Sequence, residues 1–390
     1  MRNRREALGS EPRPMTAACI RDAVRAASQA PSVHNTQPWR FHWDGRYLSI
    51  WPDWSRQLPV LDPSGRQLAI SCGAALGHAV VALRPAGRDP RVTLADGLGQ
   101  GGPFAILDTE PGLAPAGVQQ AAALFAAVRH RRSIRDARAP EAVPPSLSYA
   151  LVGAAAAEGA TLTPVTEPGR RRDVQALIAR ADTAQRSDPS YRAELHDWSR
   201  PPVKRGWTAS RAAPPPARRD PAVPNRFIRP LPGDGRPLAP GQAAADPARG
   251  DGPSPPAAAP SPLAAAPSLL ALSTREDRMT DWLVAGRALS TVLLVATNLG
   301  LGVMLANQPV DSEAFREAVA RSAGVPGFAH AVLVVGYPAA RSGPRSPRQD
   351  VDTLFTDGSA PGAAAAAGGG PAGQQAYPAA GSSARGAEAT

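Results

Sequence analysis

A proline-rich stretch, residues 201–267, constrains this 390-residue chain more than any other feature of its sequence. It holds 18 prolines in 67 residues, and runs such as Pro214-Pro215-Pro216 remove the backbone donors that helices and sheets need. We therefore expect a linker or lid between two folded blocks. We also expect a disordered polar lead at residues 1–14 and a disordered Ala/Gly/Ser-rich tail at residues 357–390.

The two remaining blocks, about 15–200 and 268–356, have the composition of a folded protein. Hydrophobic residues make up 43% of the chain and aromatic residues only 5%, so a core would rely on Ala, Val and Leu. Cys19 and Cys72 are too few for a disulfide framework, and no Cys/His pair has the spacing of zinc ligands. No apolar stretch follows the first charged residues, so we expect no signal peptide and a cytoplasmic protein.

The net charge of +10 suggests a nucleic-acid partner at first sight. Between Arg200 and Asp251, however, ten basic residues face four acidic ones, so most of the excess lies in the proline-rich stretch. Nucleic-acid binders carry a basic face on a folded motif, and the sequence contains no such motif. The uncharged run 288–306 is almost long enough to span a membrane, but polar residues and Gly300-Leu301-Gly302 interrupt it. We expect a buried helix there, and neither a nucleic-acid nor a membrane partner.

Hydrophobic periodicity predicts an α+β fold, rich in helices and with scattered strands. Thr16 can cap a first helix that stops before Pro31, and Asp44-Gly45 can turn a hairpin of alternating apolar residues. The other predicted elements are helices at 64–83, from about 117, at 145–158, 168–186, 277–298 and 312–321, and strands at 91–95, 161–165, 269–272, 302–305 and 331–335.

A loop between the first helix and the hairpin, within residues 30–41, carries four polar side chains between two prolines. These side chains are Ser32, His34, Asn35 and Gln37. A loop held in this way can present hydrogen-bond donors to a planar polar ligand. Alternatively, the same groups only satisfy backbone atoms in a helix-to-strand turn. The residues by themselves leave both interpretations open.

A second polar motif is Arg131-Arg132-Ser133-Ile134-Arg135. Guanidinium groups offer fork-shaped donors that match a phosphate, and the serine hydroxyl adds another. The alternative is a solvated basic end of a helix, where cations suit the helix dipole. A third basic cluster, Arg345 and Arg348, follows Gly336-Tyr337-Pro338 and could equally be an ordinary polar tail.

Taken together and in order, these motifs resemble the FMN-dependent nitroreductase family, and most closely its Acg-like subgroup of long, two-half NAD(P)H nitroreductases from actinobacteria. The resemblance covers about 15–200 and 268–356. It rests on the motifs at 30–39, 65–76, 131–135, 281–286, 300–302 and 336–338.

The resemblance implies a nitroreductase-like fold in which one chain forms a fused pseudo-dimer, with central buried helices and mixed sheets. In ordinary members the Arg-Arg-Ser motif precedes the Asn/Gln loop, whereas here the order is reversed. The first half (15–116) would supply the loop and the second half (117–200 and 268–356) the arginines. One complete FMN site per chain would remain, and the protein would act as a monomer.

The resemblance also implies roles for individual residues in that site. The FMN phosphate would be held by Arg131, Arg132, Ser133 and Arg135, with Arg348 closing the site. Ser32, Asn35 and Gln37 would contact the ribityl chain and the ring edge, His34 would lie near the N1–C2=O edge, and the backbone of Ala306 and Asn307 would face the ring.

The implied function is a flavin oxidoreductase, in which NAD(P)H is the co-substrate and a nitroaromatic or a quinone accepts the electrons. No side chain is required as acid, base or nucleophile, because hydride transfer takes place at the flavin. Two departures from the subgroup leave an alternative open: Gln349 stands where an arginine is expected, and the region between the halves is expanded. The alternative is a non-enzymatic protein that sequesters flavin in an occluded site. A basic protein that binds a partner without any cofactor is a third hypothesis.

Overall fold

A computed structural model of the chain describes residues 15–95, 101–112, 115–133, 141–199, 268–338 and 346–359. The expected disordered lead and the proline-rich stretch lie outside these residues, and so does Arg135 of the predicted phosphate motif. The helices and strands expected from the sequence are all present, with ends that differ by a few residues. Those not foreseen include one strand of each half and a helix that follows the predicted helix at 168–186.

The first half folds around a five-stranded sheet. Its elements are α1 (Ala17–Ala27), β1 (Trp39–Trp43), β2 (Tyr47–Pro52), α2 (Arg66–Leu83), β3 (Arg91–Leu94) and β4 (Ala105–Asp108). Three short 3-10 turns lie at Val33–Asn35, Trp54–Arg56 and Arg84–Ala86. Thr16 caps α1 as expected, because its side chain accepts a hydrogen bond from the backbone N–H of Cys19. The alternating Trp39, Phe41 and Trp43 are buried, which directs one face of β1 into the core.

The second half contains the remaining helices and a four-stranded sheet in the order β5-β6-β8-β7. Its elements are α3 (Pro115–His130), α4 (Pro145–Ala156), β5 (Thr161–Pro164), α5 (Pro168–Ser187), α6 (Pro189–Ser199), β6 (Ser268–Thr274), α7 (Met279–Asn298), β7 (Gly302–Leu305), α8 (Gln308–Asp311), α9 (Glu313–Ala323), β8 (Phe328–Gly336), α10 (Val351–Leu354) and β9 (Phe355–Asp357).

The end of the described chain crosses back into the first half. Strand β9 pairs in parallel with β1, so the first sheet has the order β3-β4-β2-β1-β9 and is mixed. The second sheet is antiparallel in its three strand pairings, and a single parallel bridge joins Ser133 to Val303 at its edge. Asp357 ends β9, and the N–H of Gly358 donates to the carbonyl of Trp43. The expected tail from residue 357 therefore begins too early, because β1 holds this segment in a sheet.

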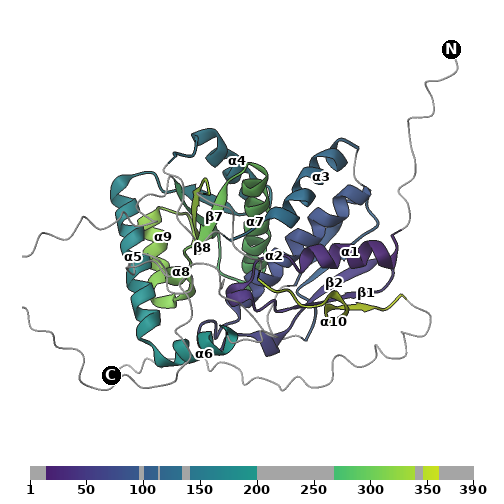
Figure 1. Cartoon of the computed structure of the whole chain (residues 1–390), viewed down its shortest axis with the longest axis horizontal. Helices are drawn as coiled ribbons and strands as arrows, with labels where there is room; N and C mark the ends of the chain where they lie inside the picture. Colours follow the sequence, from purple (N-terminus) through teal and green to yellow (C-terminus); the bar gives the residue numbers. More distant parts are fainter. Residues whose placement is uncertain are drawn as a thin grey trace, which may run out of the picture.

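Helices α2 and α7 form the centre of the molecule, between the two sheets (Figure 1). Both are long and apolar enough to cross a membrane, but most of each is buried inside the fold. Glycines allow the close approach: a Cβ on Gly73 would lie 2.3 Å from the carbonyl oxygen of Leu283, and one on Gly286 would lie 2.1 Å from that of Ile70. The uncharged run 288–306 is thus the end of a buried helix followed by β7, as the sequence predicts for its helical part.

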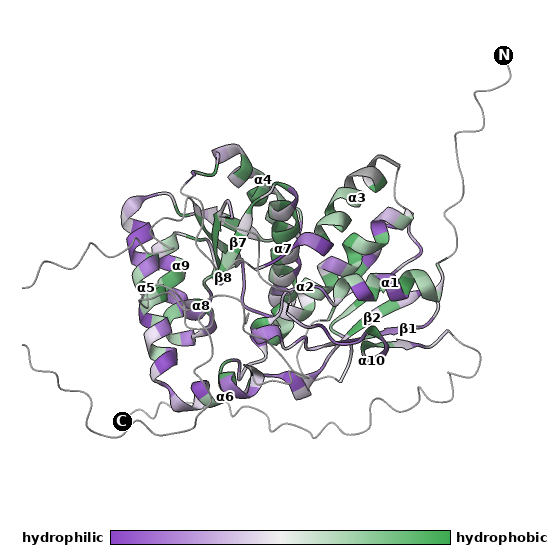
Figure 2. Ribbon diagram, in the orientation of Figure 1, coloured by the Kyte–Doolittle hydropathy of each residue, from purple (hydrophilic) through white to green (hydrophobic). Residues whose placement is uncertain are grey.

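The two halves repeat the same arrangement of elements. The order α1-β1-β2-α2-β3-β4 in the first half corresponds to α4-β5-β6-α7-β7-β8 in the second, where α5 and α6 are inserted between β5 and β6, and α8 and α9 between β7 and β8. In both sheets the strands lie in the sequence first, second, fourth, third. The contacts of Gly73 with Leu283 and of Gly286 with Ile70 are reciprocal, so α2 and α7 approach each other in the same way from both sides. Figure 2 shows that hydrophobic residues concentrate along this central pair and the strands beside it.

Candidate functional site

The polar loop after α1 has an unusual backbone. His34, Asn35 and Gln37 have φ angles of 46°, 56° and 51°, and within the described part of the chain no other non-glycine residue has a positive φ. Each such residue costs about 1 kcal/mol or more, and strain of this kind concentrates at functional sites. The hydroxyl of Ser32 stabilises the loop by accepting a hydrogen bond from the N–H of Gln37 at 3.0 Å. The N–H of Val33 donates to Ser71 of α2, which fixes the loop to the central helix.

The amide side chains of this loop hold residues 347–349 of the C-terminal segment. Asn35 Nδ2 donates to the carbonyl of Pro347 at 2.9 Å, while its Oδ1 accepts from the guanidinium of Arg348. Gln37 Oε1 accepts from the N–H of Gln349 at 2.9 Å, and the Gln349 side chain donates back to the carbonyl of Gln37 at 2.8 Å. The loop of the first half therefore positions Arg348 of the second half.

Two arginines from different parts of the chain meet at one backbone carbonyl. Arg131, just after α3, and Arg348 both donate to the carbonyl oxygen of Gln29, at 2.8 Å and 3.2 Å. The pKa of the buried His78 of α2 lies well below its ordinary value. Burial is the largest cause, and the positive charges of Arg131 and Arg348 lower this pKa further. Two cations that converge on one neutral acceptor create a positive potential that favours a bound anion.

The remaining predicted residues lie on the second-half side of this region. Arg132 and Ser133 are partly exposed, and Ser133 pairs with Val303 at the start of β7. At the other end of β7, Ala306 donates its N–H to the carbonyl of Val332, and Asn307 Oδ1 accepts from the N–H of Val332 at 3.0 Å. Ala306 and Asn307 are therefore held by β8. That Ala306 and Asn307 face the flavin ring, and that Arg135 binds the phosphate, remain predictions.

A helix that the sequence did not predict covers part of the loop. Tyr191 of α6 is buried, and its ring centre lies 6.1 Å from that of His34. Glu194 accepts hydrogen bonds from the N–H groups of Val60 and Leu61 at 2.9 Å and 3.0 Å, so α6 is fastened to the first half at two points. The sequence did not indicate this docking helix, because α6 is short, has mixed polarity and lies next to the proline-rich stretch. His34 thus has an aromatic neighbour from the second half.

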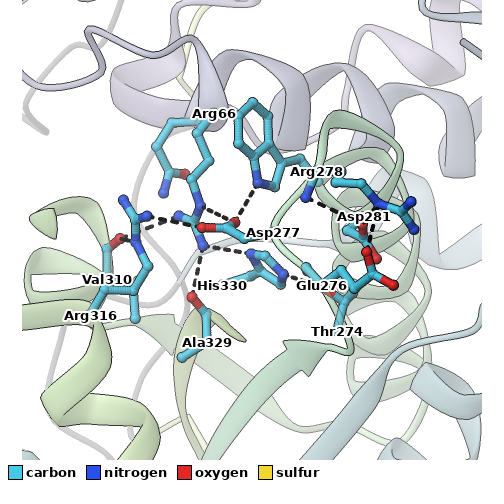
Figure 3. A network of polar contacts seen from close by, with 12 residues as sticks. Arg66, Thr274, Glu276, Asp277, Arg278, Asp281, Val310, Arg316, Ala329 and His330 are labelled. Carbon is cyan, nitrogen blue, oxygen red and sulfur yellow. Dashed lines mark hydrogen bonds and ion pairs between the residues drawn. The ribbon is translucent and has the colours of Figure 1, made fainter. Parts of the chain in front are cut away.

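A buried ionic network also joins the halves (Figure 3). Arg66, in the first turn of α2, pairs with Asp277 at 3.2 Å and donates to the carbonyls of Val310 and Ala329. Arg316 pairs with the other oxygen of Asp277 at 3.2 Å and also donates to Val310. Burial and the neighbouring Arg316 lower the pKa of Arg66 to about 10, so the guanidinium stays charged at neutral pH.

The protonation of His330 follows from its neighbours in this network. Arg66 Nη2 is a donor, so the His330 Nδ1 that it contacts must be an acceptor. The ring proton therefore lies on Nε2, which faces the hydroxyl of Thr274, and that hydroxyl donates to the carbonyl of Glu276 at 2.7 Å. Burial and then Arg66 lower the pKa of His330 well below its ordinary value, in agreement with a neutral ring. The sequence marked Arg66 only as part of the 65–76 motif.

The chain belongs to the nitroreductase family. The sequence model of that family matches residues 128–337. A Mycobacterium tuberculosis protein named "Putative NAD(P)H nitroreductase Rv3131" is 33% identical over 329 residues, which are 84% of this chain and 88% of the relative. Another from the same species, "Putative NAD(P)H nitroreductase acg", is 28% identical over 366 residues, 87% of this chain and 96% of the relative. The resemblance inferred from the motifs is confirmed.

Solved structures of similar proteins include an FMN-bound nitroreductase from Bacteroides fragilis. It is 17% identical, with a TM-score of 0.35, and the match covers 59% of this chain and 96% of that protein. The nitroreductase NfnB from Mycobacterium smegmatis, solved with NADPH, is 17% identical with a TM-score of 0.34, and 60% of this chain and 97% of that protein are covered.

The residues present suit a phosphorylated flavin such as FMN. The clearest fit is at the phosphate, because Arg131 and Arg348 converge at the Gln29 carbonyl and a phosphate would neutralise their combined charge. The strained loop and the central helix α2 border the same region, since Val33 donates to Ser71 and His78 lies in the field of both arginines.

Proposed function

We propose that the protein is an FMN-binding, NAD(P)H-dependent oxidoreductase that reduces a small nitroaromatic or quinone. The observation that supports this most directly is the meeting of Arg131 and Arg348 at the carbonyl of Gln29. Arginine pairs of this kind bind phosphate through charge-assisted, often bidentate hydrogen bonds. Membership of the nitroreductase family and the names of the two mycobacterial relatives support the same function.

The chain's own residues have binding and orienting roles in this proposal. Arg131, Arg132, Ser133 and Arg135 hold the phosphate, and Arg348 closes it from the C-terminal segment that Asn35 and Gln37 keep in place. Ser32, Asn35 and Gln37 line the ribityl chain and the ring edge, with His34 near that edge. The backbone of Ala306 and Asn307 would face the ring. The flavin, when bound, supplies the hydride chemistry, so the protein needs no acid, base or nucleophile of its own.

We infer further that the chain is a fused pseudo-dimer with one FMN and that it acts as a monomer. The repeated order of elements, the reciprocal contact of α2 with α7 and the crossing of β9 into the first sheet support this arrangement. The first half, 15–116, supplies the polar loop, whereas the second half, 117–200 and 268–356, supplies the arginines. Each half is incomplete without the other, which explains a single site.

The decisive experiment is to purify the full chain, quantify the flavin and add NADPH or NADH without oxygen. The proposal predicts one FMN per chain and bleaching of the absorbance near 450 nm within seconds. Absence of bound flavin after reconstitution would contradict the proposal, and two flavins per chain would contradict the pseudo-dimer.

A second candidate function, the sequestering of flavin without turnover, is favoured by the docking of α6. Tyr191 packs against the loop that carries His34, and the two hydrogen bonds of Glu194 hold α6 there. A helix fastened over the loop would limit access for a nicotinamide. In the experiment above, a flavin that stays yellow with both nicotinamides would favour this candidate.

A further inference from the structure

The two-fold repeat allows each half to be searched for the counterpart of the other half's site. Helix α1 ends at Ala27 and α4 at Ala156, and the caps that follow, Ser28 and Ala157, make the same backbone hydrogen bonds. In each half the residue after the cap donates its N–H to the carbonyl of the residue three positions earlier. Gln29 donates to Ala26 at 3.0 Å, and Glu158 donates to Ala155 at 3.1 Å. Glu158 is therefore the counterpart of Gln29.

The central helices give the same correspondence independently. Gly73 matches Gly286 through their reciprocal contacts, and the same register matches His78 with Thr291. In the first half His78 lies in the field of the two arginines that meet at Gln29. In the second half Thr291 Oγ1 donates to the carboxylate of Glu158 at 3.0 Å. The neighbourhood of Gln29 and His78 therefore recurs at Glu158 and Thr291.

What differs is the origin of the charges. In the first half both cations come from the other half of the chain, and they meet at a neutral acceptor, the backbone carbonyl of Gln29. In the second half the cation is Arg287 of α7, whose Nη2 donates to Glu158 at 2.5 Å. The pair is largely buried, with side-chain exposures of 22% for Arg287 and 11% for Glu158. The protein thus provides its own anion at this position.

The guanidinium of Arg287 has more donor capacity than this carboxylate satisfies. Its Nε is buried and has no hydrogen-bond partner in the described structure. A phosphate has more acceptor oxygens than a carboxylate and can accept from several N–H groups of one guanidinium at once. The cluster therefore has the chemistry of an oxyanion site in which a carboxylate occupies the anion position.

The structure points to Arg287 and Thr291 as a latent oxyanion site, for a phosphate or phosphate monoester, that the Glu158 carboxylate keeps closed. This inference rests on the proposed function, because it takes Gln29 to mark the FMN phosphate. It explains why the pseudo-dimer would keep one flavin: the second position holds an internal counter-ion. The short connection from Glu158 to β5 at Thr161 also leaves no room for a counterpart of the polar loop.

The test is to remove the internal anion and offer an external one. We expect Glu158→Ala to lower the melting temperature, since Arg287 loses its partner, and inorganic phosphate to restore part of the loss. Half of the phosphate effect should be reached at a concentration about tenfold lower than in the wild type, the factor that one charge-assisted contact typically supplies. The proteins are saturated with FMN, and sodium chloride of equal ionic strength is the reference.

Matched variants distinguish phosphate binding at Arg287 and Thr291 from a general stabilising effect of phosphate. Glu158→Gln removes the charge with little change of shape and should show the same direction of response. The double variant Glu158→Ala/Arg287→Ala should lose the stronger response to phosphate. Glu167 is an exposed glutamate that pairs with Arg170 of α5, and Glu167→Ala should behave as the wild type. Equal phosphate responses in the wild type and both Glu158 variants would overturn the inference, as would a response that survives in the double variant. If the wild type binds no FMN, the proposed function fails, but the comparison with phosphate remains valid.

Discussion

A Cβ added to Gly286 of α7 would lie 2.1 Å from the carbonyl oxygen of Ile70 on α2. This backbone-to-backbone contact brings the two halves of the molecule together, and it leaves no space for any side chain. Because the obstacle is backbone on both helices, it cannot be relieved by a change of rotamer. The position therefore tests whether the α2–α7 contact holds the fold together.

We expect Gly286→Ala to lower the free energy of unfolding by about 1–3 kcal/mol, the range for overpacking a tight interior. The matched control is Gly153→Ala in α4, where an added Cβ would meet nothing within 4 Å. That change should be neutral or stabilising, because alanine favours a helix by up to about 1 kcal/mol. Urea denaturation followed by circular dichroism measures both, and equal effects would contradict the close contact.

Replacement of Arg131 tests the proposed phosphate site. Arg131→Ala removes a charge-assisted contact worth about 1.5–3 kcal/mol, so FMN should bind roughly 10- to 150-fold more weakly. Arg129→Ala is the control, because Arg129 is exposed in the last turn of α3, and it should leave the FMN affinity unchanged. Fluorescence titration of flavin gives the affinities. Unchanged affinity together with lower thermal stability would instead assign Arg131 a structural role.

The neutral His330 predicts how stability depends on pH. Its pKa is lowered in the folded state, so below about pH 6.5 the unfolded chain binds a proton that the folded chain does not. The free energy of unfolding should therefore fall as the pH falls, by up to about 1.4 kcal/mol per pH unit for this group. His78 adds a dependence of the same sign.

Asp62 has the opposite effect, because burial raises its pKa to about 6 and its protonation stabilises the fold as the pH falls below that value. Comparison with His330→Gln isolates the histidine, since the amide retains an acceptor for Arg66 and a donor for Thr274. The variant's stability should vary less steeply between pH 7 and pH 5. Parallel curves for the two proteins would show that His330 does not titrate as the network requires.

The docking of α6 can be tested through the rate of flavin reduction. Tyr191→Ala removes the ring beside His34, and Glu194→Ala removes the acceptor for two backbone N–H groups. If α6 limits access, both should speed reduction by NADPH several-fold in stopped-flow measurements. Ser190→Ala, an exposed neighbour of Tyr191, serves as the control. Rates equal to that of the wild type would mean that α6 stabilises the contact between the halves and does not limit access of NADPH to the flavin.

The sequence by itself determined most of the helices and strands, because each depends on neighbouring residues. The alternation of Trp39, Phe41 and Trp43, the cap at Thr16 and the apolar run of α7 are all local patterns. The motifs also identified the family. The resemblance implied that the polar loop and the arginines share one site, but not which atoms of these distant residues contact one another.

Only the tertiary structure decided that Arg131 and Arg348 meet at Gln29, that Asn35 and Gln37 hold the segment around Arg348, and that Arg66 joins Asp277. It also decided that β9 joins the first sheet and that α6 docks on the loop of the other half. The physical reason is that these contacts close long loops, and their geometry follows from how α2 and α7 pack. No local periodicity records that packing.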